Sequence, residues 1–371
     1  MSKEESCEGK AKFFVGNAFY NPQSKVVRDL GVLAAYLYRQ DQKKLRVLDA
    51  MSGCGVRSLR YWQESNADWM TVNEGNPELH SLLQHNLRKA IAQNCCQITH
   101  QDAHRLFFDC YHRRDYYDLV DVDCFGSAVP YLSTMLWATK INGLMYLTST
   151  DGRTATGHSP QNSLQAYGAY ARAHPAAQEQ ALRLLIGSVQ QQAATKGMGV
   201  IPIFSVFTGK TYRLMLKLVS KIQLDEDNYG FLGYCHHCGH YQTIYWRKLG
   251  KVTCSHDYRP LTISGAMWLG ELHDLDSLKR MLSLAKLWNW QEIAGLIEIM
   301  TNEIDFPPYF YTLGEIGRRG KLDIPKRSLL IKALQDNGYR ASATHINPQA
   351  IKTDANLHAC INLARKLNDK N

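Results

Sequence analysis

The chain has 371 residues, and its 45% hydrophobic and 21% charged content is that of a globular protein with a sizeable core. This composition excludes disorder over any large stretch, and no apolar run reaches the roughly 18 residues that a membrane-spanning helix needs. The 43 basic and 34 acidic side chains leave a net charge of +9, which fits either simple solubility or a polyanionic partner such as nucleic acid.

The first ten residues contain no apolar stretch, so we expect no secretory signal. Ten cysteines in such a chain predict reduced thiols and a cytoplasmic protein, and any closely spaced set of them is a candidate for metal or redox chemistry. At roughly 100–200 residues per domain, the length predicts two or three domains.

Short apolar runs alternate with longer amphipathic segments from Leu45 to about residue 220. The runs with strand character are Leu45–Asp49, Trp69–Glu74, Gln97–His100, Asp118–Asp123 and Gly143–Thr148. Helices are expected over Pro77–Ala92, where leucines recur at helical spacing, and over Gln178–Lys196. This alternation predicts an α/β, Rossmann-like fold with a mostly parallel sheet and helices on both faces.

Two further apolar runs, Gly199–Phe207 and Thr211–Val219, are separated only by Thr208-Gly-Lys210. Such a short, glycine-containing connection predicts a β-hairpin. The hairpin should add an antiparallel edge to the parallel sheet.

After Ile222 the chain changes character, because Gln223–Gly230 is a polar, acidic connector. We therefore expect a domain boundary near residue 225, with one domain in residues 1–225 and a second, α+β domain in residues 226–371. Helices expected in the second domain are Ser277–Ala285, Gln291–Ile304 and Lys326–Asp336.

A glycine turn directly follows the first strand, with the sequence Asp49-Ala-Met-Ser-Gly53-Cys-Gly55-Val-Arg57. Gly53 and Gly55 permit unusual backbone angles and the close approach of a ligand, and the helix that follows favours polar or anionic groups at its N-terminus. An acid that closes the strand, here Asp49, is typical of S-adenosylmethionine sites, where it orients the cationic amino-acid end of the cofactor. The turn therefore predicts a cofactor site.

Acidic residues also follow the next two strands. Glu74 stands where a carboxylate can accept hydrogen bonds from both ribose hydroxyls, and Asp102 with Ala103 stands where an adenine amino group would be bound. Any one of these acids could equally be a helix cap. Three acids at successive strand ends favour the binding interpretation.

The fourth strand ends in Asp123, and Phe125 follows two residues later. An exocyclic amine on a nucleobase is a poor nucleophile because its lone pair is delocalised into the ring. A carboxylate that accepts its N–H bonds localises that lone pair and can take up the proton, while an aromatic ring can stack the extruded base. Asp123 and Phe125 are therefore the candidate catalytic residues, although a solvated strand end and a core aromatic would give the same pattern.

In these motifs the sequence resembles the tRNA guanine-N2 dimethyltransferases that modify position 26 of tRNA, over nearly the whole chain. The segments that carry the resemblance are Phe19–Pro22, Arg28–Leu30, Asp49–Tyr61, Thr148–Asp151, Ala166–Gly168, Tyr212–Arg213, Ser342–His345 and Ile351–Asp354.

This resemblance implies a class I methyltransferase that moves methyl groups from S-adenosyl-L-methionine to the exocyclic N2 of guanine 26, first one and then a second. Asp123 would engage the target amine and Phe125 would stack the guanine. The residues implied to contact the cofactor are Arg28, Arg57, Glu74, Asp102 and Ala103. The sequence departs from the family pattern at Cys124, where proline is usual, which leaves the balance of mono- and dimethylation open; Glu74, where aspartate is frequent, is a minor change.

Cysteines and histidines cluster after the expected boundary, with the spacing C-x2-C-x15-C-x-H formed by Cys235, Cys238, Cys254 and His256. This spacing is typical of a tetrahedral Zn²⁺ site without an open position, which predicts a structural metal. His236, His237 and His240 leave the fourth ligand open, and a knuckle without metal is the alternative. The family resemblance implies zinc in this region, ordinarily with four cysteines.

Positive charge also concentrates after residue 225, interleaved with aromatic residues, in the stretches Arg247–Lys251, Arg318–Lys321 and Lys326–Arg327. We expect this domain to bind the tRNA backbone by salt-dependent contacts. Neither a membrane nor an obligate protein partner is inferred. An N2-guanine methyltransferase acting on rRNA, or an inactive tRNA-binding homologue, are the alternative functions.

Overall fold

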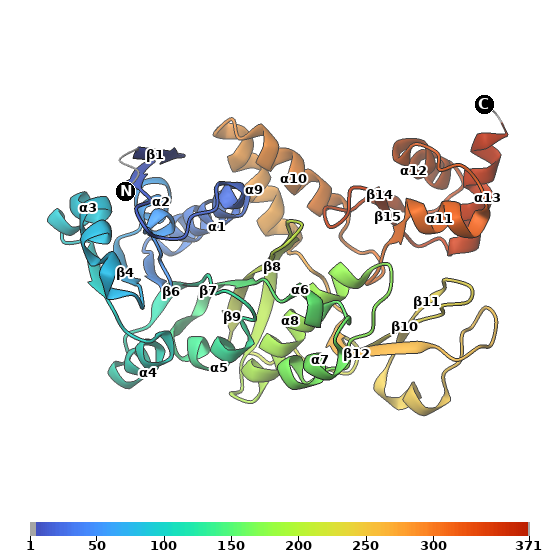
Figure 1. The fold of residues 1–371 in the computed structure, drawn as a ribbon, viewed down its shortest axis with the longest axis horizontal. Coiled ribbons are helices and arrows are strands. Elements are labelled where there is room, and N and C mark those ends of the chain that lie inside the picture. Colours follow the sequence, from blue (N-terminus) through green and yellow to red (C-terminus); the bar gives the residue numbers. More distant parts are fainter. Residues whose placement is uncertain (1–4, 370–371) are drawn as a thin grey trace.

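A seven-stranded sheet forms the centre of the N-terminal half in the computed structural model, which describes residues 5–369 (Figure 1). Its strands lie in the order β5-β4-β3-β6-β7-β9-β8. Their bounds are β3 (Arg46–Asp49), β4 (Trp69–Asn73), β5 (Cys96–Thr99), β6 (Tyr117–Val122), β7 (Thr139–Ser149), β8 (Gly199–Phe207) and β9 (Tyr212–Val219). Strands β3 to β7 run parallel to one another, whereas β9 runs antiparallel to both β7 and β8.

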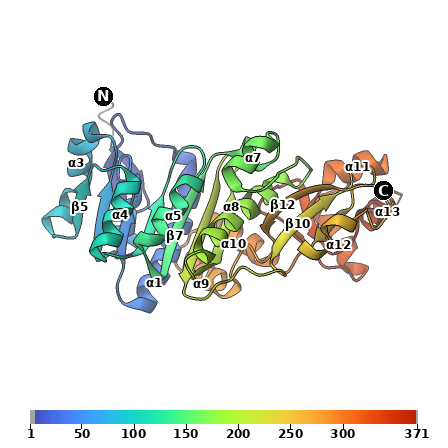
Figure 2. The same cartoon turned by 90° about the horizontal axis from the view of Figure 1, so that it is seen from below.

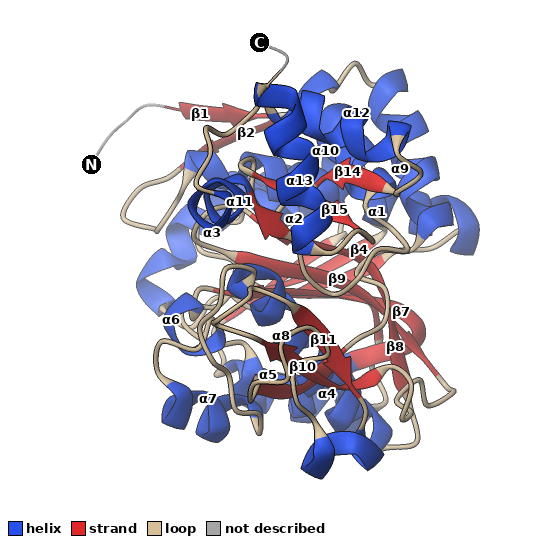
Figure 3. Cartoon of the chain, turned by 90° about the vertical axis from the view of Figure 1, so that its right-hand side faces the viewer, coloured by secondary structure: helices blue, strands red, loops and turns tan. Residues whose placement is uncertain are grey.

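Helices cover both faces of this sheet, as Figure 3 shows. One face carries α1 (Lys25–Gln42), α2 (Val56–Glu64) and α3 (His80–Ala92), and the other carries α4 (Ala103–Arg113), α5 (Val129–Ala138) and α8 (Ala177–Ala194). Strand β6 is buried on both sides of the sheet. Leu119 belongs to the core on the first face and Val120 to the core on the second, so neither face of this strand is open to solvent.

The predicted α/β architecture is confirmed, and each predicted strand and helix of the N-terminal half is present within a few residues of its expected bounds. The predicted hairpin is also present, but its two strands do not join the sheet in chain order. The second strand, β9, is inserted beside β7, and the first, β8, becomes the edge of the sheet.

The remaining N-terminal elements are short. They are the strands β1 (Glu5–Glu8) and β2 (Ala11–Phe14), the helices α6 (Gly152–Ala155) and α7 (Pro160–Tyr167), and the 3₁₀ turns Pro22–Ser24 and Pro77–Leu79. The β1–β2 hairpin packs its Ala11 and Phe13 into the core that α1 and α2 share.

The C-terminal half, which lies at the end of the molecule opposite β5 in Figure 2, combines two antiparallel sheets with helices and so has α+β character. The first sheet has the order β11-β10-β12 and the second β13-β15-β14. Their bounds are β10 (Tyr229–Tyr234), β11 (Tyr241–Ile244), β12 (Thr262–Trp268), β13 (Tyr311–Thr312), β14 (Ala341–Ala343) and β15 (Ala350–Thr353). The helices are α9 (Leu275–Leu287), α10 (Gln291–Asn302), α11 (Leu313–Gly320), α12 (Arg327–Asp336) and α13 (Leu357–Asn368), and Trp246–Lys251 is a 3₁₀ segment.

The two halves pack against each other on both sides of the sheet. Helices α9 and α10 place Met281 and Ile297 in the same core as α1, and Met267 and Trp268 of β12 belong to the core of α8. A domain boundary at residue 225 therefore stays a prediction, because segments from both sides of it share both hydrophobic cores.

Candidate functional site

The carboxyl ends of the parallel strands gather the predicted site residues at one edge of the sheet. Asp49 is the last residue of β3, and Glu74, Asp102 and Asp123 each follow a strand end in β4, β5 and β6. In an open α/β sheet this edge is where ligands bind, in the crevice between strand ends and helix starts.

The glycine turn between β3 and α2 has the backbone conformation that its sequence predicts. Gly53 and Gly55 have φ values of 54° and 79°, in the left-handed region that side chains disfavour. A Cβ atom on Gly55 would also stand 3.0 Å from Leu83 Cδ2. The Gly53 N–H donates to Glu74 Oε2 at 2.8 Å, so the turn after β3 is tied to the end of β4.

Asp49 and Asp121 are fully buried carboxylates beneath this turn. Ser58 Oγ donates to Asp49 Oδ2 at 2.6 Å, but Asp49 Oδ1 and Asp121 Oδ1 have no hydrogen-bond partner among the described residues, and neither has the hydroxyl of Ser52. Burial, reinforced by the charge of Asp121, raises the pKa of Asp49 to about 7. Unpaired acceptors at a strand end are a fit for a ligand that carries positive charge.

Two arginines clamp the carboxylate of Asp123. Arg57 Nε lies 2.9 Å from Asp123 Oδ2 while its Nη1 lies 3.1 Å from Asp121 Oδ2, and Arg213 Nη2 lies 3.2 Å from Asp123 Oδ1. The Arg57 guanidinium lies over the ring of the buried Tyr146, with 5.4 Å between its Cζ and the ring centroid. Burial alone would favour the neutral acid, but Arg57 and Arg213 hold the pKa of Asp123 well below its usual value. The Asp123 side chain nevertheless keeps 28% of its surface exposed, so it can accept hydrogen bonds from outside.

Beside this carboxylate, two aromatic rings stand at the surface. Phe125 is 73% exposed and Phe19 is 67% exposed, and their centroids lie 4.9 Å apart in an edge-to-face arrangement. Solvent-exposed aromatics offer a stacking surface for a planar ligand.

The loop that carries Phe125 is fixed by hydrogen bonds to the end of β7. Gly126 N–H donates to Thr150 Oγ1 and Thr150 N–H donates to the Gly126 carbonyl, both at 2.8 Å. Cys124 is buried, and its thiol contacts the Thr148 carbonyl at 3.3 Å. The cysteine that stands where the family usually has proline thus points into the protein.

Arg28 and Asp102 have other partners in the structure. Arg28 forms a two-point ion pair with Glu8, with distances of 2.7 and 2.6 Å, and donates to the carbonyl of Asn21 at 3.0 Å. Asp102 is exposed and caps α4 through the Arg105 N–H, while Ala103 is buried in the first turn of that helix. A contact of Arg28, Asp102 or Ala103 with a cofactor stays a prediction.

Some residues that shape this edge were not among the predicted site residues. Arg213 completes the Asp123 clamp and also donates to Thr148 Oγ1 at 2.6 Å. Asn73 donates to the carbonyls of Ala50 and Gln101 at 3.0 Å and so joins three strand ends. Asn73 could have been predicted from the sequence, because it is a polar amide at the end of a mostly apolar strand.

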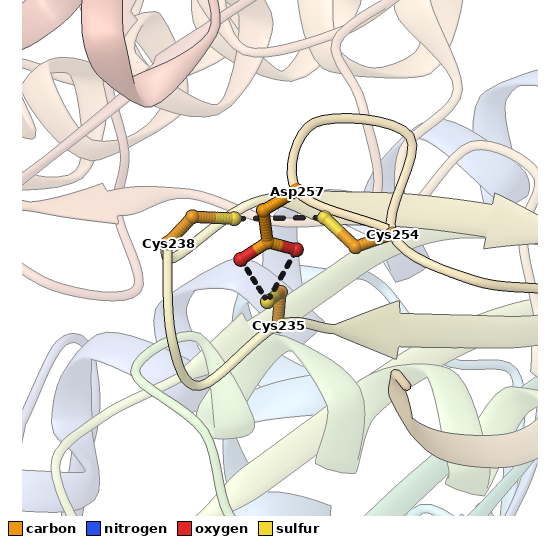
Figure 4. Close-up of side chains that lie close together, drawn as sticks. All are labelled: Cys235, Cys238, Cys254 and Asp257. Atoms are coloured by element: carbon orange, nitrogen blue, oxygen red, sulfur yellow. Dashed lines mark hydrogen bonds between the residues drawn. The ribbon is translucent and has the colours of Figure 1, made fainter. Parts of the chain in front are cut away.

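The cysteine cluster forms at the tips of two turns, from Cys235, Cys238 and Cys254 together with Asp257 (Figure 4). One ligand atom from each of the four residues lies within 4.8 Å of the others, and the sulfurs of Cys238 and Cys254 are 3.5 Å apart. Three thiolates and a carboxylate are a zinc donor set, since Zn²⁺ accepts sulfur and carboxylate oxygen in tetrahedral geometry.

The structure brings Asp257 into this cluster as its fourth member, whereas the predicted ligand His256 lies outside it. The turn Cys254–Tyr258 repeats the turn Cys235–Gly239, in each case with the N–H of the last residue donating to the carbonyl of the cysteine. Such a turn directs its first and fourth residues to the same point, which are Cys235 and Cys238 in one turn and Cys254 and Asp257 in the other. His256, the third residue, stacks instead on His240.

A second group of possible ligands, His273, Glu303 and His345, is buried between β8, α10 and β14. The Ser205 N–H donates to His273 Nδ1 at 3.3 Å, so His273 Nε2 carries a proton and donates to Glu303 Oε1 at 3.3 Å. His345 Nδ1 contacts the same carboxylate oxygen. This pattern is a hydrogen-bonded junction, and a protonated Nε2 leaves His273 no lone pair for a metal there.

The predicted RNA-contact arginines of α11 differ from each other. Arg318 is 65% exposed, but Arg319 is only 12% exposed. Arg319 bonds Glu315 on its own helix and the carbonyls of His236 and His237 in the first cysteine turn. Arg319 therefore connects α11 to the cysteine cluster, which the charge pattern alone did not indicate.

Within residues 5–369 no helix has both the length and the apolar character that crossing a membrane requires.

The chain is similar to characterised proteins over almost its whole length. The model of the family described as N2,N2-dimethylguanosine tRNA methyltransferase matches residues 3–365. The tRNA (guanine(26)-N(2))-dimethyltransferase of Saccharolobus solfataricus is 29% identical over 95% of this chain and 96% of its own length, and that of Pyrococcus abyssi is 28% identical over 98% and 99%. The solved structure of Trm1 from Pyrococcus horikoshii with S-adenosyl-L-methionine superposes with a TM-score of 0.83 at 26% identity, and covers 97% of this chain and 99% of that chain. The chain therefore belongs to the N2,N2-dimethylguanosine tRNA methyltransferase family.

Proposed function

We propose that the protein transfers methyl groups from S-adenosyl-L-methionine to the exocyclic N2 of guanine 26 in tRNA, first one and then a second. The observation that carries this proposal is the Asp123 carboxylate, which is held by Arg57 and Arg213 at the carboxyl edge of a methyltransferase sheet beside the exposed Phe125. The substrate and the reaction are inferred from the family to which the chain belongs.

The residues at the carboxyl edge fit the cofactor. Asp49, with an unpaired oxygen, would face the cationic amino-acid end, the left-handed turn at Gly53 and Gly55 leaves room for the close approach of a ligand, and Glu74 would accept from the ribose hydroxyls. Arg57, Arg28, Asp102 and Ala103 are proposed as further contacts. When bound, S-adenosylmethionine supplies an electrophilic methyl group on its sulfonium.

The chain's own residues prepare the amine to attack. Phe125 stacks the extruded guanine, and the Asp123 carboxylate accepts an N–H hydrogen bond from N2, which localises the nitrogen lone pair toward the methyl group. A methylated arylammonium is a strong acid, so a carboxylate with a lowered pKa can still take its proton and pass it to water. The clamp of Arg57 and Arg213 keeps the Asp123 oxygens in place through both methyl transfers.

Incubation of the protein with unmodified tRNA and labelled cofactor, followed by nucleoside mapping, tests this function. We expect N2-methyl- and N2,N2-dimethylguanosine at position 26, and no label in a tRNA that carries adenosine there. Label in rRNA fragments but not in tRNA would instead support an rRNA methyltransferase. Binding of tRNA without any transfer would indicate an inactive homologue.

The cysteine cluster is proposed as a structural zinc site with Cys235, Cys238, Cys254 and Asp257 as ligands. Its support is the donor set and the mutual approach of the four ligand atoms. No coordination position is left for a substrate, so the metal would stabilise the two turns. We further infer a tRNA-binding role for the C-terminal half and a cytoplasmic location, where the ten unpaired cysteines stay reduced.

The affinity for S-adenosylmethionine should rise with pH between 6 and 7.5. Because the pKa of Asp49 is raised to about 7, this carboxyl group is mostly protonated at pH 6, and a cationic ligand binds its ionised form more tightly. Linkage then predicts a roughly five- to tenfold decrease in Kd over this range, measured by calorimetry. Methylthioadenosine, which lacks the amino-acid end, is the matched ligand control and should bind with little pH dependence. An equal pH dependence for both ligands would contradict this role of Asp49.

A further inference from the structure

Three exposed basic side chains surround the Asp123 edge on the catalytic half of the molecule. Arg105 lies in the first turn of α4, Arg153 lies in α6, and Lys210 lies at the tip of the β8–β9 hairpin. Each follows the carboxyl end of a strand, which is β5, β7 or β8, so all three stand at the same edge of the sheet as Asp123.

The elements that carry Lys210 and Arg153 are connected to the catalytic candidates. Lys210 lies on the hairpin whose next strand carries Arg213, the second arginine of the Asp123 clamp. The tip itself is open, because a Cβ on Gly209 would meet no atom within 4 Å. Arg153 follows the Thr150 backbone that bonds Gly126 in the loop after Phe125. The start of α6 also abuts Tyr212, which lies 3.5 Å from a Cβ built on Gly152.

Helix α4, which carries Arg105, packs against the helix that follows the same loop. Its neighbour His104 stacks on Tyr131, with ring centroids 4.7 Å apart. Tyr131 lies in the first turn of α5, the helix that begins immediately after the loop that carries Phe125. The elements that carry Arg105 and Arg153 are thus connected to the segments that flank the loop of the exposed Phe125.

The stability of the fold does not explain these three cations. Within residues 5–369 none of the three side chains has an ion pair or a hydrogen bond. Arg105 also stands in the first turn of an 11-residue helix, where the helix dipole disfavours positive charge. Unpaired, exposed cations around a pair of exposed aromatic rings are the pattern of a surface that binds nucleic acid.

We propose that Arg105, Arg153 and Lys210 bind the phosphates on either side of the target guanine, so that the catalytic half itself holds the distorted tRNA strand while the base stacks on Phe125. This inference rests on the proposed function. Extruding a base costs unstacking energy, and phosphate contacts next to that base hold the strand in its extruded form. The C-terminal half would then contact more distant parts of the tRNA.

The experiment measures tRNA affinity as a function of salt for the triple variant Arg105→Ala, Arg153→Ala and Lys210→Ala. Each phosphate contact contributes about 0.7–0.9 to the slope of log K against log salt, so the slope should fall by about 2 to 3. We expect tRNA affinity at 100 mM salt to fall by about 10- to 100-fold, with the Kd for S-adenosylmethionine unchanged.

The chain offers a matched control at the opposite edge of the same sheet. Lys43 caps the end of α1, Arg114 caps the end of α4, and Lys221 follows β9, and all three are exposed. The triple variant Lys43→Ala, Arg114→Ala and Lys221→Ala removes the same charge and should keep the wild-type slope and affinity.

The outcomes separate this proposal from the proposed function. Equal losses in both triple variants would reduce the effect to net charge and overturn the specific surface, as would a wild-type slope in the first variant. If the wild-type protein neither binds nor methylates tRNA, the proposed function itself fails. If the wild-type protein methylates guanine 26, and only the Arg105, Arg153 and Lys210 triple variant has a lower salt slope and a lower tRNA affinity, both proposals stand.

Discussion

Replacement of Asp123 by asparagine should lower the rate of methyl transfer by a factor of about 100 to 1,000, the loss found when one preorganised electrostatic group is removed from an active site. The variant keeps the shape of the side chain but loses the charge that accepts the N–H bond of the amine. It also leaves Arg57 and Arg213 facing a neutral amide, so the clamp no longer fixes the orientation of the acceptor.

Single-turnover methylation at saturating cofactor and tRNA measures this effect on the chemical step alone. Asp109→Asn on α4 is the matched control, because it removes a carboxylate away from the clamp and should leave the rate unchanged. The Kd values for tRNA and cofactor, measured separately, show whether binding survives. A wild-type rate for Asp123→Asn would remove Asp123 from the proposed chemistry.

The pH dependence of the same reaction follows from the clamp. Because Arg57 and Arg213 hold the pKa of Asp123 below its usual value, this group is ionised throughout the range from pH 5 to 8. Its contribution to stability is present above the unfolded pKa of about 3.9 and is lost only as the pH falls through the lower folded pKa. Any rise in the methylation rate between pH 5 and 8 must therefore come from other groups, of which Asp49 is the first candidate.

The sequence was sufficient to predict which residues lie at the carboxyl edge of the sheet. It was not sufficient to predict which side chains from different strands contact each other there. Asp49, Glu74 and Asp123 could be placed because each follows an apolar run and parallel strands end together. The contact between Arg213 and Asp123 depends on where β9 is inserted, and a hairpin prediction gives no strand order. Long-range pairs of this kind have no local sequence pattern.

Local geometry also accounts for the difference between the predicted fourth ligand, His256, and the residue that the structure places beside the sulfurs, Asp257. A spacing of cysteine and histidine counts residues, but the turn decides which of them face the centre, and here the fourth residue does so. Arg28 shows the reverse case. Its place in a family motif implied a contact with the cofactor. In the structure the β1–β2 hairpin also brings Glu8 within 2.6 Å of Arg28, and no periodicity in the sequence indicated this pair.

Loss of zinc should abolish tight tRNA binding while leaving the cofactor site intact. The metal would join the turns at Cys235–Gly239 and Cys254–Tyr258, and Arg319 connects the first of these turns to α11. Structural zinc contributes directly to folding in small modules, so its loss should free both turns and the attached surface. The cofactor site should be unaffected, because the carboxyl edge of the main sheet is formed by strands other than those that carry the two turns.

The variant Cys235→Ser tests this expectation with three measurements. Metal analysis should show a fall from about one equivalent of zinc to below about a tenth, since a tetrahedral structural site needs all its ligands. The affinity for tRNA should fall at least about tenfold while the Kd for S-adenosylmethionine is kept, as expected when a metal-dependent module alone unfolds. Cys7→Ser, at an exposed cysteine outside the cluster, should change neither. Wild-type tRNA affinity in a zinc-free variant would show that the metal is dispensable.

The neighbouring residues 256 and 257 decide which side chain completes the site. His256→Ala should retain zinc, because its ring lies against His240 and outside the cluster, whereas Asp257→Ala should lose it. Asp257→Cys gives the cluster four cysteine ligands and should keep the metal and tRNA binding, which separates loss of a ligand from damage to the turn. Zinc loss in His256→Ala with retention in Asp257→Ala would instead return the fourth position to the histidine. The two positions are adjacent in one turn and so have the same surroundings in the fold. A difference in zinc content between their variants therefore shows which of the two side chains binds the metal.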